Sequence, residues 1–229
     1  MSGFGRGSLR FVVSEELRLS STETNRFLSL VLANGWNAAI LERTPQLMLG
    51  DWWLTAGCLA QSVWNGVYNR APDQGIRDYD IFYFDADTSW AAEDAVIRNA
   101  AVLFEDMPIT VEIRNQARVP LWYEGKFGLA FPPVRAASDA IDRFPCASVA
   151  IGVRRVDEEF KIHAPFGLAP VLRGELIPNP ALEVPEVYAA KARRWCRVWP
   201  DLKVRPWPTR RSGLRKPASG APGEDFFCD

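Results

Sequence analysis

The chain has 229 residues, of which 48% are hydrophobic and 24% charged, an ordinary globular composition with enough apolar material for a core. The formal net charge of -1 provides no general attraction to nucleic acid or to an anionic membrane. No apolar run reaches the roughly 20 residues of a membrane-spanning helix, and the apolar patch near the N-terminus is too short for a signal peptide.

The residues that most often hold metals are scarce. The cysteines Cys58, Cys146, Cys196 and Cys228 form no CxxC pair, which argues against a zinc–thiolate site and against a disulfide framework. Reduced thiols indicate a cytoplasmic protein. The single histidine, His163, ends an apolar strand and is expected to be structural. A metal site must then use mainly oxygen ligands, which suits Mg²⁺ or Mn²⁺.

Periodicity and capping patterns predict alternating helices and strands. In chain order these are a helix over about 23–34, a short helix or turn before residue 52, a strand over 52–56, a helix over 58–69, a strand over 78–85, a helix after a Ser89 cap, a strand over 109–115, a strand pair within 146–155 and 160–164, and a helix over 185–199. The helix after Ser89 carries a stripe that is expected to face the core: Trp90, Ile97, Ala101 and Phe104. The alternation indicates an α/β or α+β domain with a mixed β-sheet flanked by helices, plus a C-terminal strand pair and helix.

Composition also divides the chain into three parts. Residues 1–19 are expected to be a flexible N-terminal segment, and residues 20–203 are expected to form the domain. Residues 204–229 are rich in proline, glycine, serine and basic side chains, which favours a disordered tail. The basic residues of that tail are more typical of a solvated segment than of a nucleic-acid site.

Two carboxylates open the stretch DYDIFYF. Because alternate side chains of a strand share a face, Asp78 and Asp80 point one way while Tyr79, Ile81 and Tyr83 point the other. Neighbouring carboxylates repel each other and are costly to bury, so a compensating charge is needed. A divalent cation is the natural candidate, although an Asp-x-Asp pair taken alone also fits a surface turn.

Two further features accompany this pair. Gly57 lies where a strand turns into a helix, so backbone N–H groups there can receive phosphate oxygens. Glu112 lies on the polar face of a strand whose other face is apolar. If the strands of Asp80 and Glu112 are neighbours, three carboxylates converge beside the turn, which suits two divalent ions about 3.5 to 4 Å apart.

The order of glycine turn, helix, Asp-x-Asp strand, helix and acidic strand resembles the nucleotidyltransferase superfamily related to DNA polymerase β. The signature of that superfamily is a hydrophobic residue, Gly, then Gly or Ser, followed by Asp-x-Asp on a strand and a third carboxylate on a neighbouring strand. The stretches LTAGCLAQSVWN, DYDIFYFD, VEIRNQARVPLWY and APFGL are similar to a bacterial nucleotidyltransferase-like family of unknown function. The resemblance covers roughly residues 25–203.

The resemblance implies Mg²⁺- or Mn²⁺-dependent transfer of a nucleoside monophosphate group from a nucleoside triphosphate to an acceptor hydroxyl. Catalysis and metal binding would fall to Asp78, Asp80 and Glu112. The acceptor is unidentified, no membrane is involved, and nucleic acid is possible but not the favoured partner.

The nucleotide contacts that the resemblance implies lie around the glycine turn. Gly57 and the turn through Cys58 would hold the triphosphate. Arg114 would reach phosphate with its planar guanidinium, but pairing with a local carboxylate fits its position equally well. Gln61, on the helix after the turn, fits a cleft-facing or a solvent-facing position equally well.

Two departures from the family pattern leave alternatives open. Cys58 stands where the pattern has Gly or Ser, so a hydroxyl contact to phosphate is missing, and a packed thiol is favoured over a reactive one. Ala169 and Pro170 stand where an acid is expected after Leu168. One alternative is therefore a non-catalytic nucleotide- or metal-binding module of the same fold. Another is a metal-dependent phosphodiesterase that uses the same carboxylates with water as nucleophile.

Overall fold

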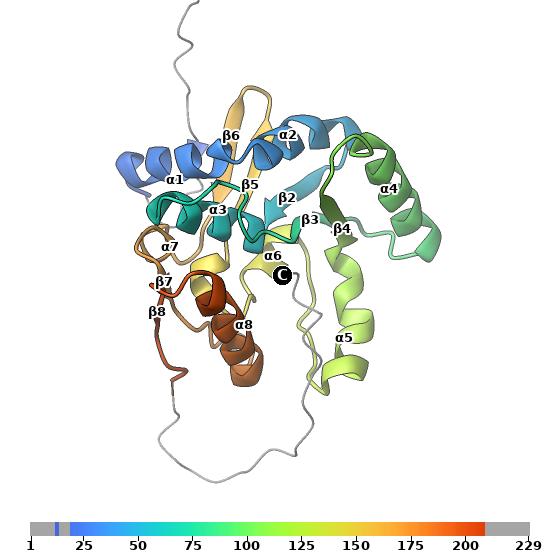
Figure 1. Cartoon of the computed structure of the whole chain (residues 1–229). Helices are drawn as coiled ribbons and strands as arrows, with labels where there is room; N and C mark the ends of the chain where they lie inside the picture. Colours follow the sequence, from blue (N-terminus) through green and yellow to red (C-terminus); the bar gives the residue numbers. More distant parts are fainter. Residues whose placement is uncertain (1–11, 14–18, 209–229) are drawn as a thin grey trace, which may run out of the picture.

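The structure is a computed structural model that describes residues 12–13 and 19–208 (Figure 1). Its α-helices are α1 (Ser21–Ala33), α2 (Gly35–Arg43), α3 (Gly57–Val67), α4 (Trp90–Leu103), α5 (Val119–Phe127), α6 (Ala137–Ile141), α7 (Ala169–Leu172) and α8 (Pro185–Val198). Short 3₁₀ helices are η1 (Thr44–Leu47), η2 (Gln116–Arg118) and η3 (Ala147–Val149). Its strands are β1 (Val12–Val13), β2 (Asp51–Thr55), β3 (Asp78–Phe84), β4 (Thr110–Asn115), β5 (Gly152–Val156), β6 (Glu159–His163), β7 (Glu175–Leu176) and β8 (Lys203–Val204).

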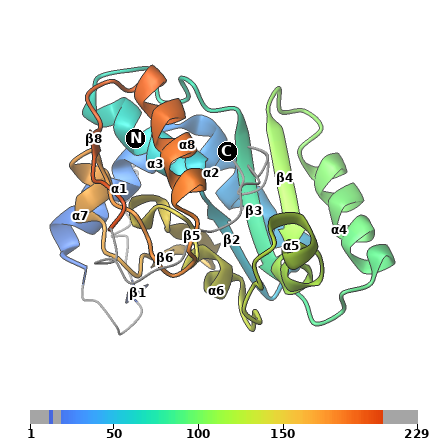
Figure 2. The ribbon, with the colours of Figure 1, turned by 90° about the horizontal axis from the view of Figure 1, so that it is seen from below.

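The main sheet is mixed, with the strand order β1-β6-β5-β2-β3-β4. The pairs β1–β6 and β3–β4 are parallel, and the other pairs are antiparallel. Strands β7 and β8 form a separate parallel pair near the C-terminal end of the described chain. Helix α4 packs along β4 at one edge of the sheet, as Figures 1 and 2 both show. The predicted mixed sheet flanked by helices is confirmed, and the strand pair predicted within 146–164 is β5–β6, which extends the sheet beside β2.

The two faces of β3 are covered by different parts of the chain. On one face, the hydroxyl of Tyr79 accepts a hydrogen bond from Asn34, between α1 and α2, at 3.1 Å. On the other face, the ring of Phe82 meets Phe144 edge-on, with centroids 5.6 Å apart. On this face α6 packs closely on β5, since a Cβ atom at Gly152 would lie 2.9 Å from the terminal methyl of Ile141. The aspartates of β3 share this second face with Phe82.

The first third of the domain differs from the sequence prediction because the dipeptide Asn34–Gly35 ends one helix and also begins another. The side chain of Asn34 accepts a hydrogen bond from the N–H of Trp36 at 3.0 Å and so caps α2. The pattern was interpreted only as a helix end, and α2 was missed. Ser20 is the N-cap residue of α1, but its side chain makes no capping hydrogen bond.

The stripe predicted for α4 is wrong at two positions. Trp90 is 79% exposed and Ala101 is also exposed, whereas Glu93, one turn away from both Trp90 and Ile97, is buried. The carboxylate of Glu93 lies 2.9 Å from the guanidinium of Arg118 and accepts a hydrogen bond from the N–H of Asn115. This buried polar contact fixes the rotation of α4 against β4, and the apolar pattern alone carries no sign of it.

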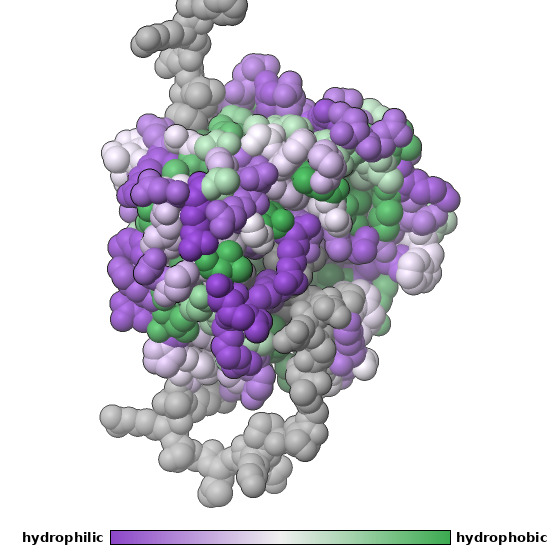
Figure 3. All heavy atoms as spheres, viewed as in Figure 1, coloured by the Kyte–Doolittle hydropathy of each residue, from purple (hydrophilic) through white to green (hydrophobic). Residues whose placement is uncertain are grey.

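Helix α8 brings the C-terminal part of the domain against α3. Pro185 occupies its first turn, and the buried face carries Tyr188 and Trp195. The rings of Trp195 and Trp199 each lie 5.5 Å from that of Trp64 in α3. The outer face of α8 is mostly hydrophilic (Figure 3). The packing of these tryptophans holds α8, the last long helix, beside the turn at the start of α3.

The predicted domain limits fall close to the ends of the described chain. The boundary predicted at residue 203 lies within β8, and Val204 pairs with Leu176 of β7. Residues 1–11, 14–18 and 209–229, which include most of the two terminal segments predicted to be flexible, lie outside the described residues. In the part that is described, no helix has the length and apolar character required to cross a membrane.

Candidate active site

The turn between β2 and α3 has a strained backbone. Strand β2 ends at Thr55, helix α3 begins at Gly57, and Ala56 between them has φ 63° and ψ -139°. An alanine rarely adopts a positive φ, and such a conformation costs about 1 to 3 kcal/mol. The surrounding structure must hold the turn in place, which is typical of a site that presents backbone groups to a ligand. Sequence reasoning located Gly57 but not Ala56, because alanine is not a turn-forming residue.

Cys58 is packed behind this turn. Its side chain is buried, and its thiol donates a hydrogen bond to the carbonyl oxygen of Thr55 at 3.2 Å. Burial raises the pKa of the Cys58 thiol well above its usual value, and the nearby negative charge of Asp80 raises it further. The thiol is therefore neutral at physiological pH, and the preference for a packed rather than a reactive cysteine is confirmed.

The strands that carry the acids are neighbours. Strands β3 and β4 pair in parallel with Asp80 opposite Glu112, and neighbouring strands lie about 4.7 to 4.9 Å apart. On the other side, Asp80 pairs with Thr55 of β2, the residue just before Ala56. The register therefore places Asp78, Asp80 and Glu112 on one face of the sheet, next to the strained turn.

Asp78 and Asp80 are removed from water to different extents. Asp80 is fully buried and Asp78 is half-buried. Burial raises the pKa of Asp78, and the negative charge of Glu112 raises it further. The positive charges of Arg194 and Lys191, both on α8, and of Arg77 act in the opposite direction. The carboxylates thus form an acidic cluster that nearby cations only partly offset.

The donor set meets only part of what a divalent cation requires. The Oδ1 atom of Asp78 is buried and has no hydrogen-bond donor among the described residues, so it fits a metal ligand. Glu112 is on the expected strand, but its side chain is 41% exposed and one carboxylate oxygen lies 3.8 Å from Arg114. Within residues 12–13 and 19–208, no three His, Cys, Asp or Glu side chains are arranged to hold a metal ion. Asp78 and Asp80 fit such an ion by type and burial, whereas Glu112 would have to leave Arg114.

The cationic side of the site comes from α8. Lys191 and Trp195 line a small pocket together with Ala56 and Gly57. Lys191 is 8% exposed, which is unusual for a lysine and means that its ammonium group lies inside the protein rather than in solvent. These α8 residues were interpreted from the sequence only as part of a packing helix. The available signal was the basic run KARR, but nothing in the sequence identifies the element that it faces.

Of the other two residues predicted to contact the nucleotide, Gln61 faces a pocket and Arg114 pairs with a carboxylate. Gln61 is 4% exposed and lines a second pocket with Arg77 and Arg194, so it faces a cleft rather than solvent. Arg114 is half-exposed and pairs with Glu112. Pairing with a local carboxylate was the alternative to a phosphate contact for this residue. His163 lies 2.6 Å from Asp142 through Nε2 and takes no part in the acidic cluster.

Comparisons with known proteins agree with this arrangement. The sequence model of a nucleotidyltransferase family matches residues 42–204. Among solved structures, the chain is similar to a protein whose NMR structure is described as revealing a CCA-adding enzyme head domain. The two sequences are 26% identical, the match covers 75% of this chain and 90% of that chain, and the TM-score is 0.61. Comparison with the curated proteins gave no match.

Proposed function

Because the chain belongs to the nucleotidyltransferase family, we propose that it transfers a nucleoside monophosphate group from a nucleoside triphosphate to an acceptor hydroxyl in a Mg²⁺- or Mn²⁺-dependent reaction. The observation that carries the proposal is the register that sets Asp80 opposite Glu112 on β3 and β4, beside the turn at Ala56 and Gly57.

Each part of the site has a role in this proposal. Asp78 and Asp80 hold the metal, and Glu112 completes the set after releasing Arg114. A Mg²⁺ or Mn²⁺ ion held by these residues would supply charge neutralisation for the triphosphate and a lower pKa for the acceptor hydroxyl. The N-terminus of α3 at Gly57 and Cys58 binds phosphate oxygens through backbone N–H groups. The acceptor oxygen attacks the α-phosphorus and pyrophosphate leaves, with positioning and charge neutralisation lowering the barrier.

A second candidate function, a non-catalytic nucleotide-binding module, is supported by Cys58. Its thiol is directed to the carbonyl of Thr55, so the turn offers phosphate no side-chain hydroxyl at this position. Backbone N–H groups and the two aspartates would still bind a metal–nucleotide complex. The two candidates therefore predict the same binding and differ only in whether pyrophosphate is released.

The first test is a calorimetric titration of the four nucleoside triphosphates, with and without Mg²⁺. We expect binding to require Mg²⁺ and to weaken at least about 100-fold in an Asp78→Asn/Asp80→Asn double variant, which lacks both metal-binding charges. Asp85→Asn/Asp87→Asn is a matched control, because it removes two aspartates of the same spacing just beyond β3 and should leave the affinity unchanged.

Two results would decide against parts of the proposal. If the unmodified protein binds no nucleoside triphosphate in the presence of Mg²⁺, both candidate functions are wrong. If Mg²⁺-dependent binding is found but a screen of hydroxyl acceptors gives no pyrophosphate release, the non-catalytic candidate replaces the transfer reaction. Hydrolysis of model phosphodiesters without a nucleotide would instead point to a phosphodiesterase.

A further inference from the structure

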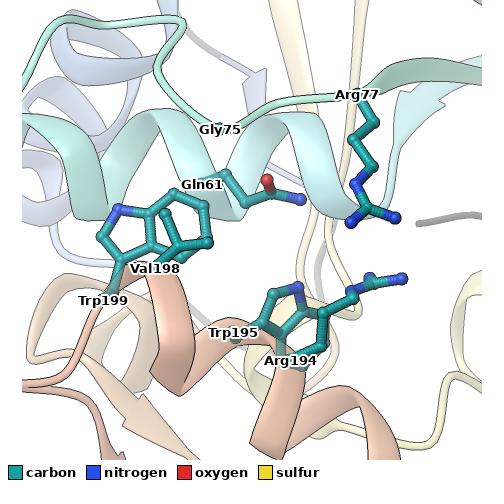
Figure 4. Close-up of a pocket in the computed structure, with 7 residues that line it drawn as sticks. All are labelled: Gln61, Gly75, Arg77, Arg194, Trp195, Val198 and Trp199. Atoms are coloured by element: carbon teal, nitrogen blue, oxygen red, sulfur yellow. The ribbon is translucent and has the colours of Figure 1, made fainter.

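A second pocket lies between α3, α8 and the segment that leads into β3. It is lined by Gln61, Gly75, Arg77, Arg194, Trp195, Val198 and Trp199. Figure 4 shows the guanidinium groups of Arg77 and Arg194 approaching each other from opposite walls, with the amide of Gln61 above the same space. Two cations from elements far apart in the sequence thus meet in one cavity.

The polar groups that face this cavity are mainly hydrogen-bond donors. Trp195 is 3% exposed, and its indole Nε1 is buried with no hydrogen-bond partner among the described residues. Figure 4 shows this nitrogen on the side of the ring that faces Gln61 and Arg77. An indole N–H and a guanidinium can only donate, and the Gln61 amide can donate as well. A buried donor without a partner is costly, so the pocket calls for an acceptor-rich ligand.

The pocket is also next to the acidic cluster. Arg77 directly precedes Asp78, and the positive charges of Arg194 and Arg77 both act on the Asp78 carboxyl group. Trp195 lines this pocket and also the small pocket at Ala56 and Gly57, so the two spaces share one residue of their lining. A ligand held at the turn and by Asp78 therefore lies within a short distance of the cationic pocket.

We propose that the pocket of Gln61, Arg77, Arg194 and Trp195 binds the terminal phosphate groups of the nucleoside triphosphate. The identification of the ligand as a nucleoside triphosphate rests on the proposed function. That the ligand is an anion is inferred from the pocket itself. The two guanidinium groups offer planar, multiple N–H donors that match phosphate oxygens, and the indole N–H supplies a further fixed donor. The site thus selects triphosphate over monophosphate.

The size of the pocket supports a phosphate group rather than a nucleobase. Its volume is about 30 Å³, room for a group the size of a few water molecules and far below the roughly 300 to 1,000 Å³ of pockets that hold a whole ligand. A whole nucleotide does not fit in this space. In this proposal only the end of a phosphate chain that starts at the α3 turn enters the pocket, and the rest of the nucleotide stays outside.

The test compares Arg194→Gln with Arg193→Gln, which removes the same charge from the same helix at an exposed position. Calorimetry with Mg²⁺ measures the nucleoside triphosphate that binds best, the corresponding monophosphate, and inorganic tripolyphosphate. We expect Arg194→Gln to weaken triphosphate and tripolyphosphate binding about 10- to 100-fold and to leave the monophosphate unchanged, since hydrogen bonds to charged groups contribute on this scale. Arg77→Gln should act in the same way, and Arg193→Gln should change nothing.

The outcomes separate this proposal from the proposed function. If Asp78 and Asp80 are needed for triphosphate binding but Arg194→Gln and Arg77→Gln have no effect beyond that of Arg193→Gln, the phosphate pocket is wrong and the proposed function stands. If tripolyphosphate binds through Arg194 but no nucleoside triphosphate binds, the proposed function is wrong and the anion pocket remains. If inorganic phosphate still binds through Arg194 at saturating triphosphate, the pocket serves a phosphate on the acceptor, and the assignment to the nucleotide is overturned.

Discussion

Asp78 is in an electrostatically unfavourable position. It is half-buried, it shares a face with Asp80 and Glu112, and both burial and the charge of Glu112 raise its pKa. A carboxyl group whose pKa is higher in the folded than in the unfolded state binds more protons when folded. The free energy of unfolding therefore decreases as the pH rises through that pKa, and the ionised group destabilises the fold at neutral pH.

We therefore expect Asp78→Asn to increase the free energy of unfolding at pH 7, and this gain to fade as the pH falls below the raised pKa. Urea denaturation at pH 7 and at about pH 4 measures both values. Asp87→Asn is a control for which we expect the opposite sign. Hydrogen bonds from Ser89 lower the pKa of Asp87, so the Asp87 carboxylate stabilises the fold at neutral pH and loses that effect in acid. Asp87→Asn should therefore decrease the free energy of unfolding at pH 7. Loss of stability at pH 7 in Asp78→Asn would contradict this account of the site.

Single residues also show what the sequence can and cannot predict about the site. The alternation in DYDIFYF was enough to place Asp78 and Asp80 on one face, because a strand of period two admits no other arrangement. The preference for a packed over a reactive Cys58 agrees with the burial of its side chain. The strained backbone of Ala56 could not be predicted, because its positive φ is imposed by the elements on both sides rather than by its own side chain.

Helix α8 supplies half of the proposed site, and its position depends on tryptophan packing against α3. Trp199 is 1% exposed, its ring lies 5.5 Å from that of Trp64, and its indole N–H donates to Asn65 at 2.8 Å. This hydrogen bond joins two residues that are 134 positions apart in the chain. Lys191, Arg194 and Trp195 can face the acidic cluster only while this packing is intact.

We expect Trp199→Ala to lower the free energy of unfolding by about 3 to 5 kcal/mol, the usual range for removing a buried tryptophan. The loss of the indole also leaves the buried Asn65 side chain without one hydrogen bond. Trp90→Ala serves as control, since Trp90 is 79% exposed and the guanidinium of Arg118 lies over its ring, 4.5 Å from the ring centroid. This substitution should lower the free energy of unfolding by about 1 kcal/mol or less. Equal losses in the two variants, measured by urea denaturation, would show that α8 is not anchored in this way.

Elements with a clear period were predicted well, and their mutual placement was not. Strands β3 and β4 follow from alternation, and α8 follows from the spacing of Tyr188 and Trp195. That β4 lies beside β3, and that α8 lies beside α3, are long-range contacts that leave no periodic trace in the sequence. For the same reason the position of Arg194 beside Asp78 was missed, although its helix was predicted within one residue at its C-terminal end.

The described chain is organised around one continuous hydrophobic core. A single cluster of buried side chains runs from Phe27 in α1 through Trp52 and Ile162 in the sheet to Trp199 after α8. A smaller cluster around Tyr123 and Phe131 packs against Phe84 at the C-terminal end of β3. Because the main cluster includes residues from both ends of the predicted domain, these ends stabilise each other, and the strained turn and the acidic face lie within a single packed unit.

We propose on this basis that residues 20–203 unfold as one domain, and we expect differential scanning calorimetry of the full chain to give one transition. Its calorimetric enthalpy should equal the van't Hoff enthalpy, as for a two-state domain, and should be roughly 130 kcal/mol near 60 °C for a unit of about 190 residues. Trp199→Ala should lower the midpoint of that transition without splitting it, because Trp199 belongs to the shared core. Two resolved transitions would instead mean that α8 and the sheet fold independently. In that case the phosphate pocket between α3 and α8 would depend on the docking of two separate units, and nucleotide binding would have to bring them together.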